Sequence, residues 1–171
     1  MAELLVLING LPGSGKTTLG GPLAKALNAH FLSKDAAKEA FSPHMADHST
    51  LGSTAMTAIW ALARAIPTTV VIDSWWFKPR DLAFAQAGIE HSRATHAIEV
   101  WCDIPPALAK RRYENRHRPA FYQDAERLAQ DWDLWAAQAT PLGLTPTVFV
   151  DTTTPVNHLH LTERIREAAA R

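Results

Sequence analysis

The segment GLPGSGKT, residues 10–17, constrains the fold of this chain more than any other feature. It follows a continuous aliphatic run, residues 3–9, which is typical of a strand covered on both faces of a parallel sheet. A segment with helical character, residues 17–28, comes directly after it. The pattern G-x-x-x-x-G-K-[ST] between a strand and a helix predicts a loop whose backbone amides bind phosphate at the helix N-terminus.

The residue types of this loop suit the phosphates of a nucleotide. Its glycines permit a close approach of the backbone to phosphate oxygens. The Lys16 ammonium can reach the β- and γ-phosphates, and the Thr17 hydroxyl can bind Mg²⁺. The residues expected to contact the nucleotide here are Gly10, Leu11, Pro12, Gly13, Ser14, Gly15, Lys16, Thr17 and Thr18.

The remainder of the chain alternates between strand-like and helical segments. Such alternation predicts a single α/β domain over residues 1–171 with a parallel sheet of five strands. A polar, interrupted segment at 42–53 is expected to be a mobile connection. The further strands are predicted at 29–35, 68–74, 96–103 and 145–152, and helices at 36–41, 54–66, 82–94, 105–119, 124–139 and 155–171.

Composition limits the classes of function. The formal net charge of the 171 residues is +0, so nucleic-acid binding would have to rest on a local basic patch. Cys102 is the only cysteine, which suits a reducing compartment, and no segment is apolar enough to span a membrane. We therefore expect a cytoplasmic protein. The pairs His44/His48 and His158/His160 lack the Glu or Cys partners of a zinc site, so no such site is expected.

Two carboxylates are expected at the carboxyl ends of strands, where an open parallel sheet places its ligand crevice. Asp35 closes the second predicted strand and could accept the proton of an attacking hydroxyl, or it could only N-cap the next helix. Lys38, one turn later, could hold an anionic group. Asp73 closes the third predicted strand and is a candidate Mg²⁺ ligand, directly or through water, or a strand-end cap.

Three consecutive aromatic residues follow the third strand: Trp75, Trp76 and Phe77. Alternation along a strand cannot bury all three side chains on one face, so at least one ring should border the crevice. Such a ring could form a wall for the acceptor. Core packing is the alternative for each ring. Trp132 and Trp135 are spaced to share a helix stripe and are predicted to be core residues.

A strongly basic segment covers residues 110–118. Arg112 and Arg116 are one helical turn apart, and guanidinium groups suit the oxygens of a transferring phosphoryl group. The segment could also be a solvated face or a basic patch for RNA. Its late position in the chain, before "PAFYQD", favours a lid that binds phosphate.

In their order and spacing, these segments resemble small P-loop kinases. The segments that carry the resemblance are "LINGLPGSGKTTL", "SKDAAKEAF", "VVIDS", "ALAKRRYENRHRP" and "VFVDTTTPV". The group includes polynucleotide 5′-kinases, chloramphenicol phosphotransferases, zeta-toxin-type kinases and gluconate kinases. The resemblance covers nearly the whole chain, and only the phosphate loop is individually specific. It implies the three-layer P-loop nucleoside-triphosphate hydrolase fold, with strand order 2-3-1-4-5.

The resemblance also implies roles for particular residues. Asp35 matches the residue that handles the acceptor hydroxyl, and Lys38 matches a basic residue one turn after it. Arg112 and Arg116 match lid arginines, with Arg118 as a third, in a lid at about 110–123 that follows an acceptor-binding segment at about 36–66. The loop at 151–155 matches the segment that lies against adenine, through Thr152 and Pro155. The double tryptophan after Asp73 matches no family pattern.

These observations predict a kinase that uses ATP and Mg²⁺ and phosphorylates a hydroxyl of a metabolite, a nucleoside or sugar, or an antibiotic. Asp35, Lys16, Arg112 and Arg116 are its expected catalytic residues. A polynucleotide 5′-kinase is the nearest alternative, although the zero net charge disfavours it. A nucleotide-switched binding protein is a third reading, which the absence of an N-K-x-D string disfavours.

Overall fold

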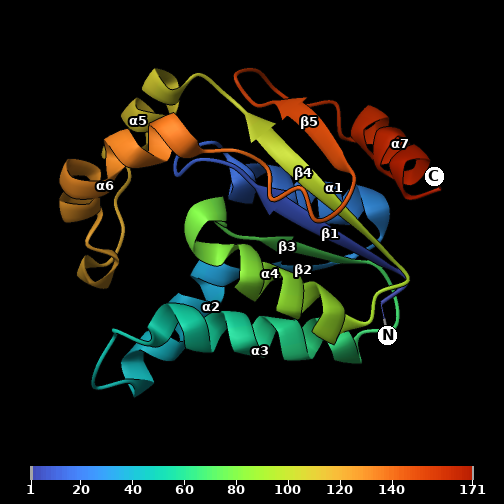
Figure 1. The fold of residues 1–171 in the computed structure, drawn as a ribbon, viewed down its shortest axis with the longest axis horizontal. Helices are drawn as coiled ribbons and strands as arrows, with labels where there is room; N and C mark the ends of the chain where they lie inside the picture. The colour runs from blue at the N-terminus through green and yellow to red at the C-terminus, as the bar shows by residue number, and fades with distance from the viewer. Residues whose placement is uncertain (1, 171) are drawn as a thin grey trace.

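The central sheet has five parallel strands in the order β2-β3-β1-β4-β5, as the resemblance implies (Figure 1). The computed structural model describes residues 2–170. The order places β1 at the centre of the sheet, so the phosphate loop that follows it opens at the middle of the sheet edge. The strands are β1 (Leu4–Asn9), β2 (His30–Ser33), β3 (Val70–Asp73), β4 (His96–Asp103) and β5 (Thr147–Asp151).

Helices cover both faces of the sheet and build a third group beyond its carboxyl edge (Figure 1). Helices α1 and α7 pack on one face, and α3 and α4 pack on the other. The helices are α1 (Lys16–Leu27), α2 (Lys34–Phe41), α3 (Leu51–Ala65), α4 (Lys78–Ser92), α5 (Pro106–Glu114), α6 (Asp124–Gln138) and α7 (His158–Ala169), with short 3₁₀ turns η1 (Ser42–His44) and η2 (Ala120–Tyr122).

The sequence of β1 follows from burial on both of its faces. Val6 and Ile8 pack toward α1 and α7, whereas Leu5 and Leu7 pack toward α3 and α4. Every residue of β1 is buried. A strand covered on both sides cannot alternate with polar residues, which explains the continuous aliphatic run.

Helices α5 and α6 form a smaller cluster at the carboxyl edge of the sheet. Trp132 and Trp135 are each 4 % exposed and pack there with Leu11 and Tyr113, which confirms them as core residues. Tyr113 and Trp132 stack with ring centroids 6.1 Å apart. This cluster anchors the lid segment above the phosphate loop.

Several predicted boundaries are wrong; α4, for example, begins at Lys78 and not at 82. Helix α3 begins at Leu51, inside the segment expected to be a mobile connection, because the Leu51 side chain is 1 % exposed and anchors the first turn. Helix α5 ends at Glu114 instead of continuing to 119. Beyond Glu114 the chain leaves the helix and runs toward α2 and α6, where Arg118 forms ion pairs with Asp35 and Asp124. Among residues 2–170, no helix is long and apolar enough to cross a membrane.

Candidate functional site

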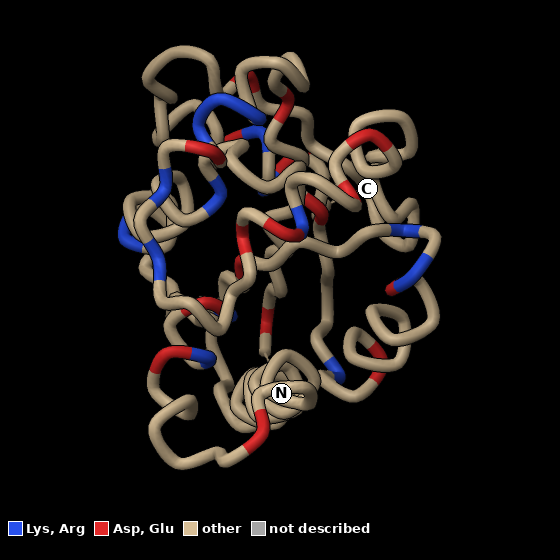
Figure 2. Tube along the Cα trace, turned by 90° about the vertical axis from the view of Figure 1, so that its left-hand side faces the viewer, with Lys and Arg blue, Asp and Glu red and all other residues tan. Residues whose placement is uncertain are grey.

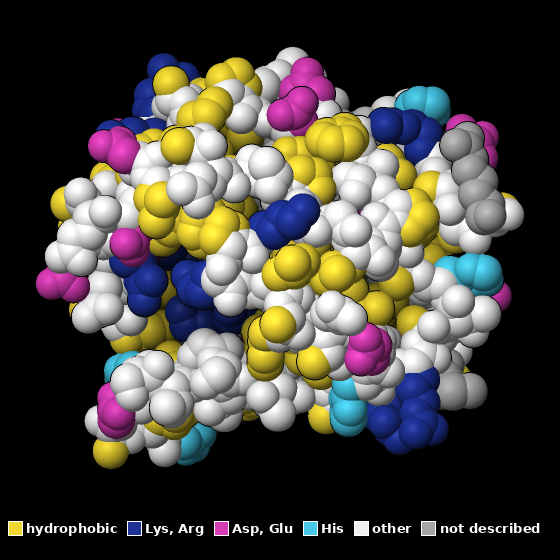
Figure 3. All heavy atoms as spheres, in the orientation of Figure 1, with side chains coloured by type: hydrophobic (Ala, Val, Ile, Leu, Met, Phe, Trp, Pro, Cys, Tyr) yellow, Lys and Arg dark blue, Asp and Glu magenta, His cyan; other side chains and the backbone are white. Residues whose placement is uncertain are grey.

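A pocket of about 1140 Å³ opens beyond the carboxyl ends of β1, β2 and β3. Figure 3 shows it as a hollow with Lys and Arg side chains inside, below the segments of α5 and α6 and above those of α2 and α3. Figure 2 faces this side of the molecule, and Lys and Arg positions lie in several of the segments there. The local charge therefore differs from the zero net charge of the whole chain.

The phosphate loop forms the floor of one half of the pocket. Gly15, the residue before α1, has φ 89°, a left-handed angle that favours glycine. At Gly13 a Cβ would lie 2.2 Å from the Ala109 carbonyl oxygen, so only glycine allows α5 to pack against this loop. The phosphate loop and α5, which begins the lid, are thus in direct contact.

Lys16 crosses the loop and points into the pocket. Its Nζ donates hydrogen bonds to the carbonyl oxygens of Gly10, at 2.8 Å, and Leu11, at 2.9 Å. Burial lowers the pKa of Lys16 to about 8, and the positive charge of Arg116 contributes to the decrease. Arg116 lines the same pocket and is exposed, so both cations can approach one bound phosphoryl group.

Thr17 and Asp73 form a pair suited to Mg²⁺. The Thr17 hydroxyl donates to Asp73 Oδ2 at 2.6 Å, and Asp73 is 3 % exposed. Within residues 2–170, its buried Oδ1 atom has no hydrogen-bond partner, and burial raises the pKa of Asp73. Hydroxyl and carboxylate oxygens are the ligands that Mg²⁺ prefers, and a cation would offset the buried carboxylate charge. The pair therefore fits the expected ion. No group of three or more His, Cys, Asp and Glu residues in the described chain could hold a metal by itself.

Asp35 lies in the first turn of α2, and not at the end of a strand as expected, because β2 ends at Ser33. Ser33 is also the N-cap of α2: its Oγ accepts a hydrogen bond from the Ala36 amide at 3.5 Å. The Asp35 carboxylate is therefore not needed as a cap. It lines the pocket and accepts a hydrogen bond from Arg118 Nη1 at 2.8 Å.

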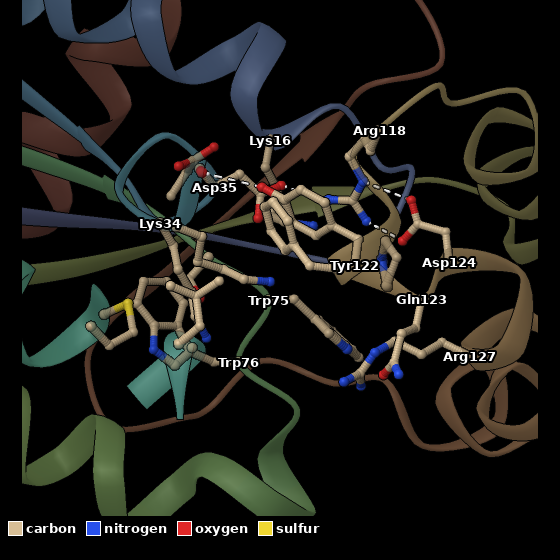
Figure 4. Close-up of a pocket in the computed structure, with 18 of the residues that line it drawn as sticks. Lys16, Lys34, Asp35, Trp75, Trp76, Arg118, Tyr122, Gln123, Asp124 and Arg127 are labelled. Carbon is tan, nitrogen blue, oxygen red and sulfur yellow. Dashed lines mark hydrogen bonds and ion pairs between the residues drawn. The ribbon is translucent and has the colours of Figure 1, made fainter. Parts of the chain in front are cut away.

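Arg118 and Tyr122 of the lid contact α2 (Figure 4). Besides Asp35, Arg118 forms an ion pair with Asp124 at the start of α6. The Tyr122 hydroxyl lies 3.1 Å from the Asp35 carbonyl oxygen and 3.2 Å from Glu39 Oε1. The contacts with α2 connect residues more than 80 positions apart and close one side of the pocket.

The Tyr122 ring also holds two cations. Lys38 Nζ lies 4.1 Å from its centroid, and the Arg118 guanidinium carbon lies 3.9 Å from it. Cations at such distances are attracted by the ring quadrupole. Burial lowers the pKa of Lys38 to about 8, although the nearby Asp35 charge opposes this. Lys38 is thus placed in the pocket, as the sequence suggested.

Arg112 lies apart from the other lid arginines and does not line the pocket. Its Nη1 donates to the Thr152 carbonyl oxygen at 3.0 Å, and its Nη2 to that of Thr153 at 3.5 Å. A Cβ on Gly15 would lie 3.9 Å from both Arg112 Nη1 and Thr152 Cβ. Arg112 therefore joins the loop containing Thr152 and Pro155 to the back of the phosphate loop.

The aromatic residues after β3 divide between pocket and core. Trp75 and Trp76 both line the pocket, whereas Phe77 is 4 % exposed and packs in the cluster of α5 and α6. Trp76 itself is 2 % exposed and lies 6.3 Å, centroid to centroid, from Trp60 of α3. Trp135 also lines the pocket, in an edge contact with Trp75 at 6.3 Å.

Several pocket residues were not predicted from the sequence. Lys34 is one: it precedes Asp35 and lies four residues before Lys38, and this spacing puts both lysines on one helix face. Arg127 of α6 and Tyr122 of η2 also line the pocket. No local pattern marks these two, because each reaches the site through the path of the chain after the lid.

Comparison with known proteins identifies a matching family and solved structures with the same fold. A family model described as "AAA domain" matches residues 5–142. Among curated proteins, none shows significant sequence similarity to the chain.

Solved structures with the same fold include kinases. A proposed kinase from Chloroflexus aurantiacus has a TM-score of 0.73 at 24% identity, with 96% of this chain and 97% of that chain covered. Kti12 from Chaetomium thermophilum, solved with ADP-AlF3, has a TM-score of 0.62 at 16% identity and coverages of 98% and 100%. Shikimate kinase from Acinetobacter baumannii, solved with shikimate, has a TM-score of 0.57 at 18% identity and coverages of 95% and 90%.

Proposed function

The chain belongs to the AAA-domain family of P-loop kinases, and from this premise we propose that it transfers the γ-phosphate of ATP to a hydroxyl of a small organic molecule. One observation carries the proposal. Asp35 lines the same pocket as Lys16, Arg116 and the Thr17–Asp73 pair. A proton acceptor and the groups that bind a phosphoryl thus face one space.

Each residue has a role in this reaction. Asp35 accepts or orients the proton of the acceptor hydroxyl, and Arg118 holds the Asp35 carboxylate in position. Lys16 and Arg116 stabilise the charge on the transferring phosphoryl group. Thr17 and Asp73 would hold Mg²⁺, which supplies further charge compensation for the phosphates.

The remaining parts serve binding. The loop with Thr152 and Pro155 lies against adenine in this proposal, and Arg112 keeps the loop in place. Residues 36–66 bind the acceptor with Trp75 and Trp76 as an aromatic wall, and residues 110–123 form the lid. The contacts of Arg118 and Tyr122 with α2 bound one side of the pocket, which favours a small acceptor over a polynucleotide.

The test is ADP release by the purified protein with a panel of acceptors, in the wild type and in Asp35→Asn. The panel holds nucleosides, aminosugars, hydroxylated antibiotics, hydroxy acids and 5′-hydroxyl oligonucleotides. We expect one class of small molecule to stimulate turnover, and Asp35→Asn to reduce it by roughly 10²- to 10⁴-fold, because general base catalysis contributes about that much.

Asp133→Asn is the matched control. Asp133 is exposed on α6 and lies outside the pocket lining, so this variant should keep wild-type turnover. Equal rates in Asp35→Asn and the wild type would reject the role of Asp35. Stimulation by oligonucleotides alone would favour the polynucleotide kinase, and tight nucleotide binding without stimulation by any acceptor would favour a nucleotide-switched protein.

A further inference from the structure

We propose that the acceptor is an acid: besides its reacting hydroxyl it carries a carboxylate or phosphate group, which Lys34, Lys38 and Arg127 bind. This inference rests on the proposed function and specifies its substrate class. It starts from the number of cations in the pocket, which is larger than the transfer of one phosphoryl group requires.

The cations of the pocket fall into three groups. Lys16 and Arg116 lie at the phosphate loop. Arg118 and Arg80 are already paired, the first with Asp35 and Asp124 and the second with Asp81. The third group, called here the acceptor cations, consists of Lys34, Lys38 and Arg127. Across residues 2–170, no carboxylate lies within 4.0 Å of a charged nitrogen of these three.

The acceptor cations approach one space from two elements. Lys34 and Lys38 share a face of α2, whereas Arg127 comes from α6. Figure 4 shows Lys34 and Arg127 on opposite sides of Trp75, with the lid residues Arg118 and Tyr122 above them. Groups on both sides of an aromatic wall can hold an anion whose carbon skeleton lies on the ring.

The surroundings of the two lysines show that their charges lack compensation. Burial lowers the pKa of Lys34 and of Lys38, and the charge of Arg127 contributes to both decreases. Asp35 and Asp81 oppose these decreases without reversing them. The Tyr122 ring offsets part of the cost for Lys38, but within residues 2–170 no aromatic ring lies in cation–π contact with Lys34. A bound anion would supply the missing negative charge.

A simple structural role explains this cluster less well. Lysines that only cover a surface extend into water, whereas Lys34 and Lys38 are half-buried and line the pocket. The three neighbouring cations repel one another, and the two half-buried lysines also lose hydration, so the cluster costs folding free energy. A bound anion would offset this unfavourable free energy.

The experiment measures binding and turnover separately. Protein saturated with Mg²⁺ and a non-hydrolysable ATP analogue is titrated with matched pairs of probes, and binding is followed by the fluorescence of the pocket tryptophans. The pairs are 3-hydroxybenzoate with 3-hydroxybenzamide, and gluconate with glucose, for a carboxylate. Glucose 6-phosphate with glucose tests a phosphate ester. The variants are Lys34→Met and Arg127→Met. The control is Arg166→Met, because Arg166 is exposed on α7 and lies outside both the lid and the pocket lining.

We expect the anionic member of at least one pair to bind at least about tenfold more tightly than its neutral partner. Lys34→Met and Arg127→Met should each remove about tenfold or more of that affinity, and Arg166→Met should retain it. The melting temperature of Lys34→Met without ligand should not fall, because the variant removes an uncompensated charge. If Lys34 had a purely structural role, Lys34→Met would instead have a lower melting temperature than the wild type.

Other outcomes would overturn the proposal. Equal affinities for the neutral and the anionic probes would contradict an anionic acceptor. The failure of every anionic probe to bind at about 10 mM would also contradict it. The two proposals can fail separately. Anion binding without turnover of any acceptor would retain the anion site and reject the kinase, whereas turnover of neutral acceptors alone would retain the kinase and reject the anion site.

Discussion

The charge of Lys16 depends on its immediate surroundings. The side chain is enclosed by the phosphate loop, and burial lowers its pKa to about 8. Arg116 adds a repulsive charge, whereas Asp73 and Asp35 attract. The ammonium is therefore charged below about pH 8 and loses its proton above that pH. An unperturbed lysine, with a pKa of about 10.4, would keep its proton there.

This shift predicts a pH dependence of nucleotide binding. Bound phosphate favours the charged form of Lys16, so the affinity for ADP should be constant below about pH 8. Above that pH it should fall by up to about tenfold per pH unit. Calorimetric titration with ADP between pH 6.5 and pH 9.5 measures the effect (the range brackets the shifted pKa).

Lys16→Met is the comparison for this measurement. It should bind ADP weakly, and its affinity should not decline in the same pH range. An affinity of the wild type that stays constant through pH 9.5 would show that Lys16 does not titrate where its burial indicates.

Helix packing depends on glycines whose role the sequence does not reveal. Gly20, Gly21 and Pro22 are unfavourable in a helix, yet α1 is continuous through them. At Gly20 a Cβ would lie 2.4 Å from the Phe31 ring, so β2 packs directly on the helix backbone. In α4, a Cβ on Gly88 would lie 2.1 Å from the Trp60 ring of α3. At Gly20 and Gly88, the close approach between elements compensates for the poor helix propensity of glycine.

Gly88→Ala should therefore destabilise the protein. The added methyl group would displace the Trp60 ring, and overpacking of this kind costs about 1–3 kcal/mol. Thermal unfolding should show a melting temperature lower by roughly 2–12 °C.

Gly21→Ala is the matched control, since a Cβ there meets nothing within 4 Å. It should leave the stability unchanged or raise it by up to about 1 kcal/mol, because alanine has the higher helix propensity. Equal stability changes in the two variants would mean that the contact with Trp60 is unimportant.

Across the whole molecule, one buried network connects the centre of the sheet to the pocket wall. Glu99, in the middle of β4, is 0 % exposed and accepts hydrogen bonds from Asn9 Nδ2 at 2.9 Å and from the Leu142 amide at 2.9 Å. Asn9 Oδ1 in turn accepts bonds from the amides of Gly10, at 2.8 Å, and Trp76, at 3.1 Å. Glu99 thereby positions the start of the phosphate loop and the aromatic wall together.

Glu99→Gln should weaken the fold although it preserves shape. An amide group in place of one carboxylate oxygen leaves a buried donor without an acceptor, which costs about 1–3 kcal/mol. Urea unfolding followed by tryptophan fluorescence measures the loss. The exposed Glu163, 3.6 Å from His160, provides the control, and Glu163→Gln should change stability by less than about 0.5 kcal/mol. A Glu99→Gln variant as stable as the wild type would contradict the role of this network.

Local patterns were sufficient to predict the parallel α/β class and the phosphate loop. Burial on both faces makes β1 a continuous aliphatic run, and a loop that binds phosphate through its backbone requires glycines at set positions. The strand order came from the resemblance to P-loop kinases, and the structure agrees with it. Boundaries such as the start of α3 at Leu51 were missed, because one buried side chain outweighed a polar local sequence.

The sequence by itself therefore determined the fold class and the phosphate loop, since each depends on neighbouring residues and their spacing. Only the tertiary structure decided which residues share the acceptor half of the pocket. Arg118 meets Asp35 across 83 positions, Tyr122 reaches α2, and Arg127 faces Lys34 from another helix. Their partners lie far away in the chain, and a local pattern contains no information about a contact that forms only when the lid folds back over the sheet edge.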